Sequence, residues 1–342
     1  MPNILHIGYH KTASTWFQKR LYPHLTSHAA VPRRVVQEAV LMDDAFAFDP
    51  ATALDRLQAG LEDAGRGRRL LLCEEELSGN PHSAGMRGAQ SKDIAERLAR
   101  TLPDAHVVVV IRNQVDMAAA LYAHYVREGG THGPRRYLCP ERYRRDVARH
   151  PFKYPLFAFS HLDYGGLVDC YARLFGEERV HLFPFERFRA DPRGFVAGYA
   201  RRLGLTLDRD LDDLDWRPDN AGFGRNALGL ARLLNRFTYR SVLDKHYIVR
   251  GLSNKVRSNL PRALAASRFA GPRQTPRELL GDDLIATIHQ RFAAPNRALA
   301  ERWGLPLAEL GYPFVHRARG DGLREPFPGH TAGSHSRARS GR

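Results

Sequence analysis

The sequence of 342 residues is poor in cysteine and has no long hydrophobic run. Its three cysteines, Cys73, Cys139 and Cys170, are too few and too scattered for a disulfide framework or a zinc site. No stretch approaches about 20 uninterrupted apolar residues, the length that a membrane-spanning helix needs. The short apolar run at residues 4–7 lacks the basic flank and the small-residue cleavage site of a signal peptide. These absences predict a cytoplasmic protein without a transmembrane segment.

Lysine is also scarce, although the chain is strongly basic. The formal net charge is +15, and only six of the 52 basic residues are lysines. The arginines are spread along nearly the whole chain rather than gathered in one stretch. A nucleic-acid interface is typically a concentrated basic patch. We therefore expect no nucleic-acid partner, and read the charge partly as compositional bias and partly as a surface suited to anionic ligands.

Short apolar segments alternate with helical patterns along most of the chain, which predicts an α/β fold with a central parallel sheet and helices on both sides. Strands are expected at residues 5–8, 69–73, 106–111 and 180–184. Helices are expected from residue 15 and at residues 51–64, 91–102, 114–127, 163–175, 192–203, 225–240 and 277–303. Residues 129–160 are rich in loop-forming residues and are predicted to form a mobile or substrate-facing segment. Residues 1–316 are expected to form a single domain, and residues 317–342 a basic, disordered tail.

A polar turn joins the first predicted strand to the first predicted helix. It reads Gly8-Tyr9-His10-Lys11-Thr12-Ala13-Ser14-Thr15-Trp16. A helix N-terminus offers free N–H groups and the positive end of the helix dipole, so such a turn favours anions. Lys11 adds a positive charge, and three hydroxyls add hydrogen-bond donors. The turn is not a Walker A loop, because His10 stands where that motif has a glycine before the lysine.

The segment Lys11-Thr-Ala-Ser-Thr-Trp resembles the Lys-Thr-Gly-Thr-Thr-Trp signature with which PAPS-dependent sulfotransferases bind the 5'-phosphosulfate of 3'-phosphoadenylyl sulfate (PAPS). A second motif, Ile111-Arg112-Asn113-Gln114-Val115-Asp116 followed by Tyr122 and Arg127, is similar to the 3'-phosphate-binding element of that family. Parts of residues 162–205 are similar to the distal half of bacterial and carbohydrate-type members. The resemblance covers roughly residues 3–240.

This resemblance implies a P-loop-NTPase-like three-layer α/β fold, PAPS as the donor, its desulfated product PAP, and no metal. The implied acceptor is a small molecule or glycan with a free hydroxyl, with a carbohydrate or glycolipid favoured. Arg112 would contact the 3'-phosphate, and Lys11 would stabilise the departing nucleotide. The implied donor-binding residues around Lys11 are His10, Lys11, Thr12, Ala13, Ser14, Thr15 and Trp16.

Two positions depart from the family pattern. Ala13 replaces a glycine, which is tolerable if the backbone there needs no positive φ. Ala120 replaces a serine that would contact the 3'-phosphate, and losing one such hydrogen bond weakens binding by about 1–3 kcal/mol. Arg225 and Asn226, just before a predicted helix, are candidates to compensate. A sulfotransferase-like protein that binds the nucleotide without turnover is therefore an open alternative.

The candidate general base lies in the acidic run Glu74-Glu75-Glu76 after the strand at residues 69–73. This run resembles the Ser-x-Glu-x-Leu-Ser element of bacterial and heparan-type members, in which Glu75 occupies the position of the carboxylate. The carboxyl ends of parallel strands meet at one edge of the sheet, so Glu75 is expected near Lys11. In the alternative interpretation, the three glutamates form a single solvated turn.

Simpler interpretations exist for several of these residues. Ser14 or Thr15 could only cap the first helix, and Arg112 could only pair with Asp116 or Glu128. His10 could contact the donor or pack beneath the loop. Two other functions also fit parts of the sequence: a P-loop-like phosphotransferase, which would need Mg²⁺, and a non-catalytic binder of polyanions. The sequence does not predict the oligomeric state.

Overall fold

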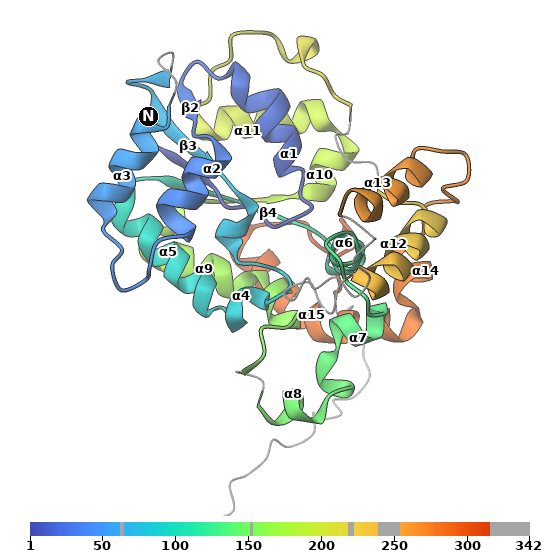
Figure 1. Ribbon diagram of the computed structural model, residues 1–342. Helices are drawn as coiled ribbons and strands as arrows, with labels where there is room; N and C mark the ends of the chain where they lie inside the picture. The colour runs from blue at the N-terminus through green and yellow to red at the C-terminus, as the bar shows by residue number, and fades with distance from the viewer. Residues whose placement is uncertain (62–64, 151–152, 218–221, 239–253, 315–342) are drawn as a thin grey trace, which may run out of the picture.

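The computed structural model describes residues 1–61, 65–150, 153–217, 222–238 and 254–314. Within these ranges, five parallel strands form one sheet in the order β2-β3-β1-β4-β5 (Figure 1). All four predicted strands are present, and the α/β fold with a central parallel sheet is confirmed. The edge strand β2 was not predicted. The strands are β1 (Ile4–His6), β2 (His28–Ala30), β3 (Arg69–Cys73), β4 (His106–Ile111) and β5 (Val180–Pro184).

Successive residues of the central strands point to opposite faces of the sheet. On β4, Val107 and Val109 pack into one hydrophobic core, and Val108 and Val110 pack into the other. Leu5 on β1 lies in register with Leu72 and Val107 on the neighbouring strands. Both faces are therefore covered, which explains why β4 reads as an unbroken apolar run.

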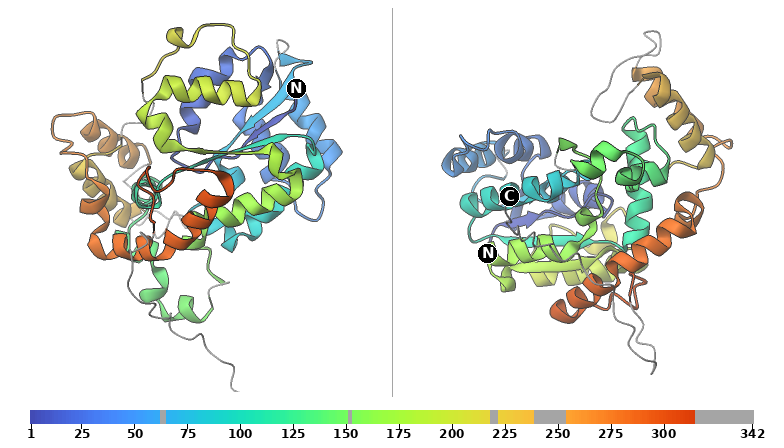
Figure 2. Two further views of the ribbon diagram at one scale, coloured as in Figure 1. Left: turned by 180° about the vertical axis from the view of Figure 1, so that it is seen from behind. Right: turned by 90° about the horizontal axis from the view of Figure 1, so that it is seen from below.

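Helices cover both faces of the sheet and extend beyond its carboxyl edge (Figures 1 and 2). One face packs against α3 (Pro50–Ala59), α5 (Ala89–Thr101) and α9 (Tyr164–Phe175). The other face packs against α1 (Ser14–Trp16), its continuation as a π-helical turn (Phe17–Leu21), and α11 (Pro192–Leu203). Figures 1 and 2 show the next group gathered to one side of the sheet: α6 (Gln114–Arg127), α12 (Arg225–Thr238), α13 (Asn254–Ala265) and α14 (Pro276–Leu280).

The remaining helices are short, apart from α15 (Asp282–Trp303). The helix predicted at residues 277–303 is in fact two helices, α14 and α15, which are separated at Gly281 with a φ of 80°. The loop-rich segment contains two short helices that were not predicted. The helix predicted at residues 51–64 ends at Ala59. The short helices are α2 (Arg33–Val36), which continues as a π-helical turn (Gln37–Leu41), α4 (Ala84–Arg87), α7 (Pro134–Leu138), α8 (Arg145–Arg149) and α10 (Phe185–Ala190).

The segment labelled α4 is a left-handed turn. All five residues from Ala84 to Gly88 have positive φ values, between 49° and 88°. Each non-glycine residue in this conformation costs about 1–2 kcal/mol. No sequence pattern pointed to it, since only two of the five residues are glycines.

Some predictions concern residues outside the described ranges. The predicted tail at residues 317–342 lies there, as do the last two residues of the helix predicted at 225–240. The single-domain boundary at residue 316 stays a prediction. Among the described residues, no helix is long and apolar enough to cross a membrane.

Candidate functional site

Three neighbouring strands end at the same edge of the sheet, and the residues that follow them form the candidate site. β1 leads into the loop that carries Lys11, β3 leads into the glutamate run at residues 74–76, and β4 leads into Arg112. Ligands of open α/β folds bind outside the carboxyl ends of the strands. The predicted site residues Lys11, Glu75 and Arg112 are thus brought to one edge.

The loop after β1 contains left-handed backbone at two residues that are not glycine. Lys11 has a φ of 66° and Ala13 a φ of 68°, whereas Thr12 between them has no positive φ. Within the described part of the chain, no backbone N–H of residues 11–14 has a hydrogen-bond acceptor. A backbone that alternates in handedness and leaves successive N–H groups free forms a concave anion site.

Ala13 does not meet the condition under which it was expected to be harmless. Its φ of 68° and ψ of 15° lie in the left-handed region that glycine adopts without strain. Ala13 is also the N-cap of α1, which begins at Ser14, so neither Ser14 nor Thr15 is the cap. Ala13 therefore adopts a glycine-like conformation at a cost of about 1–2 kcal/mol.

A hydrogen bond and close packing fix the conformation of the loop after β1. The hydroxyl of Thr12 is completely buried and donates to the carbonyl of Tyr9. A Cβ on Gly8 would come within 2.9 Å of the His6 ring and 3.3 Å of the Thr12 hydroxyl. Gly8 is thus required by close packing, and the Thr12 side chain is committed to the loop rather than free for a ligand.

Lys11 is a largely buried cation without a direct partner. Its side chain makes no hydrogen bond or ion pair with the described residues. Burial and, to a smaller extent, the charge of Arg127 lower the pKa of Lys11 to about 8, while Glu75 and Glu128 oppose this shift. Nearby positive charge and desolvation make the ammonium group favour an anionic ligand.

Arg112 joins the β4 end to the Lys11 loop. Its Nη1 donates to the carbonyl oxygen of Lys11 at 2.9 Å, and its guanidinium lies 5.0 Å from the ring centre of Phe185. Its Nε is buried and has no partner among the described residues. Burial lowers the pKa of Arg112, and nearby Asp116 partly offsets this. Asp116 forms its own ion pair with Arg189 at 3.0 Å, so Arg112 is not simply the partner of Asp116.

Sequence reasoning missed the residues that hold the Arg112 segment in place. The hydroxyl of Tyr164 donates to the carbonyl of Arg112 at 2.5 Å. The buried carboxylate of Glu186 accepts from the backbone N–H of Asn113 and from the hydroxyl of Tyr312, both at 2.8 Å. Glu186 lies two residues after the end of β5, and this position near a strand end was the available signal.

The structure places the three adjacent glutamates in different environments. Glu74 is completely buried, and its carboxylate accepts from Arg33 and from Gln37, the latter at 2.9 Å. It also accepts the backbone N–H of Glu76 at 3.1 Å. Glu74 is therefore a structural carboxylate, and the run is not a solvated turn.

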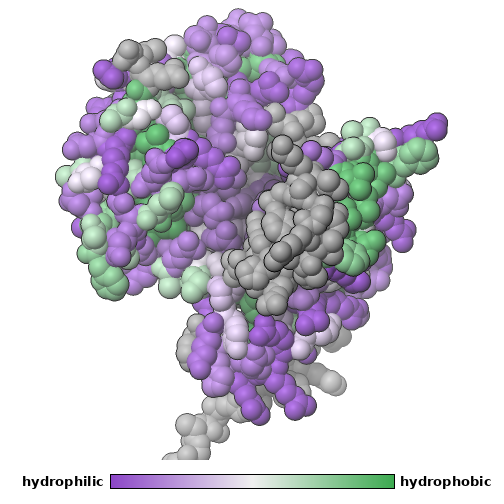
Figure 3. Space-filling model, in the orientation of Figure 1, coloured by the Kyte–Doolittle hydropathy of each residue, from purple (hydrophilic) through white to green (hydrophobic). Residues whose placement is uncertain are grey.

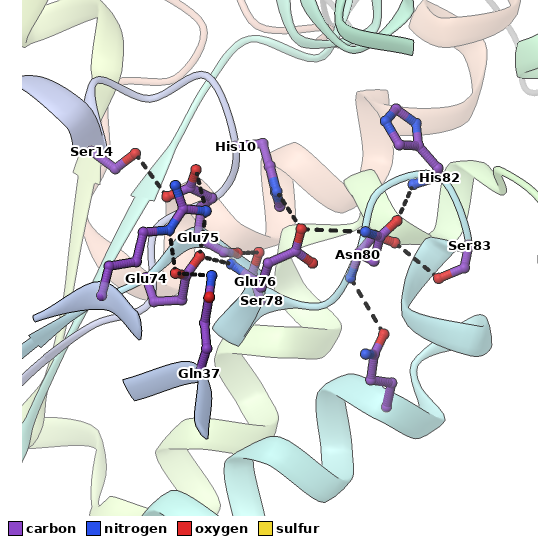
Figure 4. A network of polar contacts seen from close by, with 12 residues as sticks. His10, Ser14, Gln37, Glu74, Glu75, Glu76, Ser78, Asn80, His82 and Ser83 are labelled. Atoms are coloured by element: carbon purple, nitrogen blue, oxygen red, sulfur yellow. Dashed lines mark hydrogen bonds and ion pairs between the residues drawn. The ribbon is translucent and has the colours of Figure 1, made fainter. Parts of the chain in front are cut away.

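Glu75 faces the loop after β1 (Figure 4). Its Oε2 accepts from the hydroxyl of Ser14 at 3.3 Å, and its Oε1 lies 3.1 Å from Nη2 of Arg33. Glu75 also interacts electrostatically with Lys11. Of the three glutamates, Glu75 is the one that contacts Ser14 and interacts with Lys11, and its role as the base stays a prediction. Arg33 was not predicted, because no motif marks α2.

His10 packs beneath the loop and pairs with Glu76. Its Nε2 lies 3.2 Å from Oε1 of Glu76, and its side chain is 5% exposed. Burial tends to raise the pKa of Glu76, but the contacts with His10 and Asn80 lower it overall (Figure 4). The ring of His124 lies 6.0 Å from that of His10 and 5.3 Å from that of His82. His10 is therefore packed beneath the loop, and a contact with the donor stays a prediction.

His10, His124 and His82 therefore form a row of buried and partly buried rings. Burial lowers the pKa of His124 to about 2, and the charge of Lys11 contributes. Neutral imidazoles often ligate metals. In the described ranges, however, no group of three or more His, Cys, Asp or Glu has an arrangement that could hold a metal ion.

Trp16 and Arg225 lie apart from the loop cations. Trp16 is 4% exposed and belongs to a core cluster, where its ring stacks on Trp216 at 5.0 Å. Arg225 begins α12 and lines a cavity of about 560 Å³ together with Asn226 and Tyr122. No contact joins Arg225 to Lys11 or Arg112. Direct contacts therefore do not support the prediction that Arg225 or Asn226 replaces the hydroxyl missing at Ala120.

A small aromatic pocket of about 100 Å³ adjoins the histidine row. It shares His82 with the polar contacts of Figure 4 and lies partly within residues 129–160. The rings of Tyr125 and Tyr137 stack at 4.2 Å, and that of Phe157 lies 5.1 Å from Tyr137. The remaining lining residues are His132, Arg136, Pro140, Arg144, Pro155 and Leu156.

No family model and no curated protein matches the sequence. Among solved structures, the chain is similar to a sulfotransferase from Alicyclobacillus acidocaldarius, with 22% identity and a TM-score of 0.46 over 64% of this chain and 87% of that one. It is also similar to the sulfotransferase domain from the curacin biosynthetic pathway, with 13% identity and a TM-score of 0.34 over 83% of this chain and 98% of that one. Both neighbours are sulfotransferases. Structural similarity at this level does not identify the functional residues, so the function is inferred from the site itself.

Proposed function

We propose that the protein is a sulfotransferase that moves a sulfuryl group from PAPS to an acceptor hydroxyl. The contact between Arg112 and the loop of Lys11 carries this proposal. It places two largely buried cations side by side, and neither forms an ion pair with a described carboxylate. PAPS carries anionic groups at both its 5' and its 3' positions, so two adjacent anion sites suit it better than one.

The loop after β1 would bind the 5'-phosphosulfate. The free N–H groups of residues 11–14 supply hydrogen-bond donors, and Lys11 supplies the charge. Arg112 would bind the 3'-phosphate through its unpartnered Nε. Ser14 and Thr15 would contribute hydroxyls, while Thr12, Ala13 and His10 would shape the loop. Stacking of Trp16 on the donor base would require displacement of Trp216.

The reaction would be an in-line displacement at sulfur. A bond forms between the acceptor oxygen and sulfur while the bond from sulfur to the 5'-phosphate oxygen breaks. Glu75 takes the hydroxyl proton, and the electron pair of the broken bond stays on the phosphate of PAP. Lys11 and the loop N–H groups stabilise that developing charge. Atoms and charge balance without a metal or a redox partner.

The acceptor would bind in the aromatic pocket beside His82. Flat faces of Tyr125, Tyr137 and Phe157 suit the apolar side of a ring, and nearby arginine and histidine side chains suit its polar substituents. A carbohydrate or glycolipid hydroxyl remains the acceptor that the resemblance favours. A cytoplasmic location remains a prediction from the cysteine usage.

Transfer of radiolabel from [³⁵S]PAPS to a panel of sugar and phenol acceptors, in the presence of EDTA, tests this function. Activity that persists in EDTA and disappears in Lys11→Ala supports it. Transfer of phosphate from ATP that requires Mg²⁺ would instead support a phosphotransferase.

A further inference from the structure

The described residues of α12, α13 and the turn after α13 include basic side chains and no acidic ones. Residues 222–238 and 254–275 contain eight arginines and lysines and no aspartate or glutamate. Four exposed arginines among these form no ion pair with any described carboxylate. These are Arg236, Arg262, Arg268 and Arg273.

The same elements expose large apolar side chains. On α12, Leu233 and Phe237 are 50% and 44% exposed, and they lie one turn apart on the same side of the helix. On α13 and in the turn after it, Leu260 and Phe269 are 48% and 62% exposed. Together with the four arginines, these residues are called the α12–α13 surface. Figure 3 shows hydrophobic atoms gathered over the part of the molecule where α13 lies in Figure 1.

An exposed apolar patch that serves no packing role marks an interaction site. A soluble polyanion would satisfy the arginines but leave the leucines and phenylalanines in water. An anionic bilayer satisfies both, because its headgroup phosphates attract arginine and the boundary of its acyl chains accepts leucine and phenylalanine. Two amphipathic helices can lie on such a surface without spanning it.

We propose that the α12–α13 surface docks the protein on anionic lipid membranes. The arginines supply attraction from a distance, and Leu260 and Phe269 enter the headgroup boundary. This inference does not rest on the sulfotransferase proposal, since vesicle binding is measured without donor or acceptor. None of its residues belongs to the proposed catalytic machinery.

Co-sedimentation of the full chain with vesicles tests the proposal. Vesicles of phosphatidylcholine with added phosphatidylglycerol should bind the protein, and pure phosphatidylcholine vesicles should not. The double variant Leu260→Ser/Phe269→Ser should bind at least about tenfold more weakly, since both side chains would enter the bilayer. The double variant Arg262→Glu/Arg268→Glu should do the same, since electrostatic attraction would turn to repulsion.

Two matched controls keep the result specific. Met42→Ser/Phe46→Ser removes apolar side chains that are 72% and 103% exposed in the segment just before α3, and should bind like wild type. Figure 1 shows α3 and α13 on opposite sides of the molecule. Arg145→Glu/Arg149→Glu changes the net charge equally on α8 and should have a much smaller effect than the α13 reversal. Circular dichroism of each variant checks that it is folded.

Three outcomes would overturn the proposal. One is a failure of wild type to bind anionic vesicles. Another is a Leu260→Ser/Phe269→Ser variant that binds as well as wild type. The third is equal weakening by both charge-reversal pairs together with tight, apolar-independent binding to heparin, which would identify a polyanion partner instead.

Discussion

The side chain of Arg112 donates a hydrogen bond to the carbonyl oxygen of Lys11, which joins two motifs 101 residues apart in the sequence. Lys11 itself has a left-handed backbone with a φ of 66°. Arg112 thus helps to fix the loop, and its buried Nε still has a hydrogen bond to offer a ligand. The hydrogen bond thus links the shape of the loop proposed to bind the 5'-phosphosulfate to the cation proposed to bind the 3'-phosphate.

Replacement of Ala13 by glycine should stabilise the protein. Glycine adopts the observed φ of 68° without strain, although it loses more backbone entropy on folding. We expect the free energy of unfolding to rise by about 0.5–1 kcal/mol in urea titrations. Ala99→Gly, within α5, is the matched control and should lower it by a similar amount. A loss of stability in Ala13→Gly would show that the backbone is not left-handed there.

The charge of Lys11 predicts an alkaline limb in the pH profile. Burial lowers the pKa of Lys11 to about 8, so the ammonium form is lost as the pH rises through that value. The kcat/KM for the donor should therefore fall about tenfold per pH unit above the pKa of the free enzyme. Lys11→Arg keeps a charge at high pH and should move the limb upward. A profile that is flat above pH 8 in wild type would contradict this role of Lys11.

Glu75 and Glu74 should differ in what their loss affects. Glu75→Gln removes the proposed base and should lower kcat by about 10²–10³, with little change in stability. Glu74→Gln removes a buried acceptor of Arg33 and Gln37 and should lower the free energy of unfolding by about 1–3 kcal/mol. Single-turnover assays and urea titrations measure the two effects. If Glu75→Gln retained full kcat, the base would have to be another residue.

Buried histidines make the fold sensitive to acid. Burial lowers the pKa of His6 to about 3, of His161 to about 3 and of His181 to about 4, from an ordinary value of 6.5. A lowered pKa means that the native state favours the neutral ring. The resulting stability is present above pH 6.5 and is lost as the pH falls toward the folded-state values. Each such histidine contributes up to about 1.4 kcal/mol per pH unit in that range.

His181 offers a direct check of this acid sensitivity. It is hydrogen bonded to His106 at 2.8 Å and accepts from Arg202 at 3.1 Å. His181→Asn removes one titrating group, so its stability should fall less steeply than that of wild type between about pH 7 and pH 5. Urea titrations at several pH values give both slopes. Equal slopes would show that His181 does not gain a proton on unfolding.

The repeating patterns of apolar residues were sufficient to predict most of the secondary structure and the sheet. Alternating apolar strands and helices predicted the parallel sheet, and strand ends predicted that Lys11, Glu75 and Arg112 share one edge. Single residues in unusual environments were not readable. The left-handed backbone of Ala13 and the turn at 84–88 depend on packing, as does the choice of Trp216, 200 positions away, as the residue on which Trp16 stacks.

The acidic run shows the same limit on a smaller scale. Glu74, Glu75 and Glu76 look alike in sequence, and their different roles arise from three partners in distant segments. Glu74 meets Arg33, Glu75 meets Ser14, and Glu76 meets His10. Only Ser14 and His10 belong to a recognisable motif. The contact of Glu74 with Arg33 of α2 could be recognised only in the folded structure.

Calorimetric titration of PAP into wild type, Lys11→Ala and Arg112→Ala, without metal, tests the central claim most directly. The account predicts micromolar binding to wild type, with each variant weakened by about tenfold or more, as expected when a charged hydrogen-bond donor is lost. Ala99→Gly serves as the control with unchanged affinity. Absence of PAP binding, or equal binding to all three proteins, would contradict a donor site built from Lys11 and Arg112.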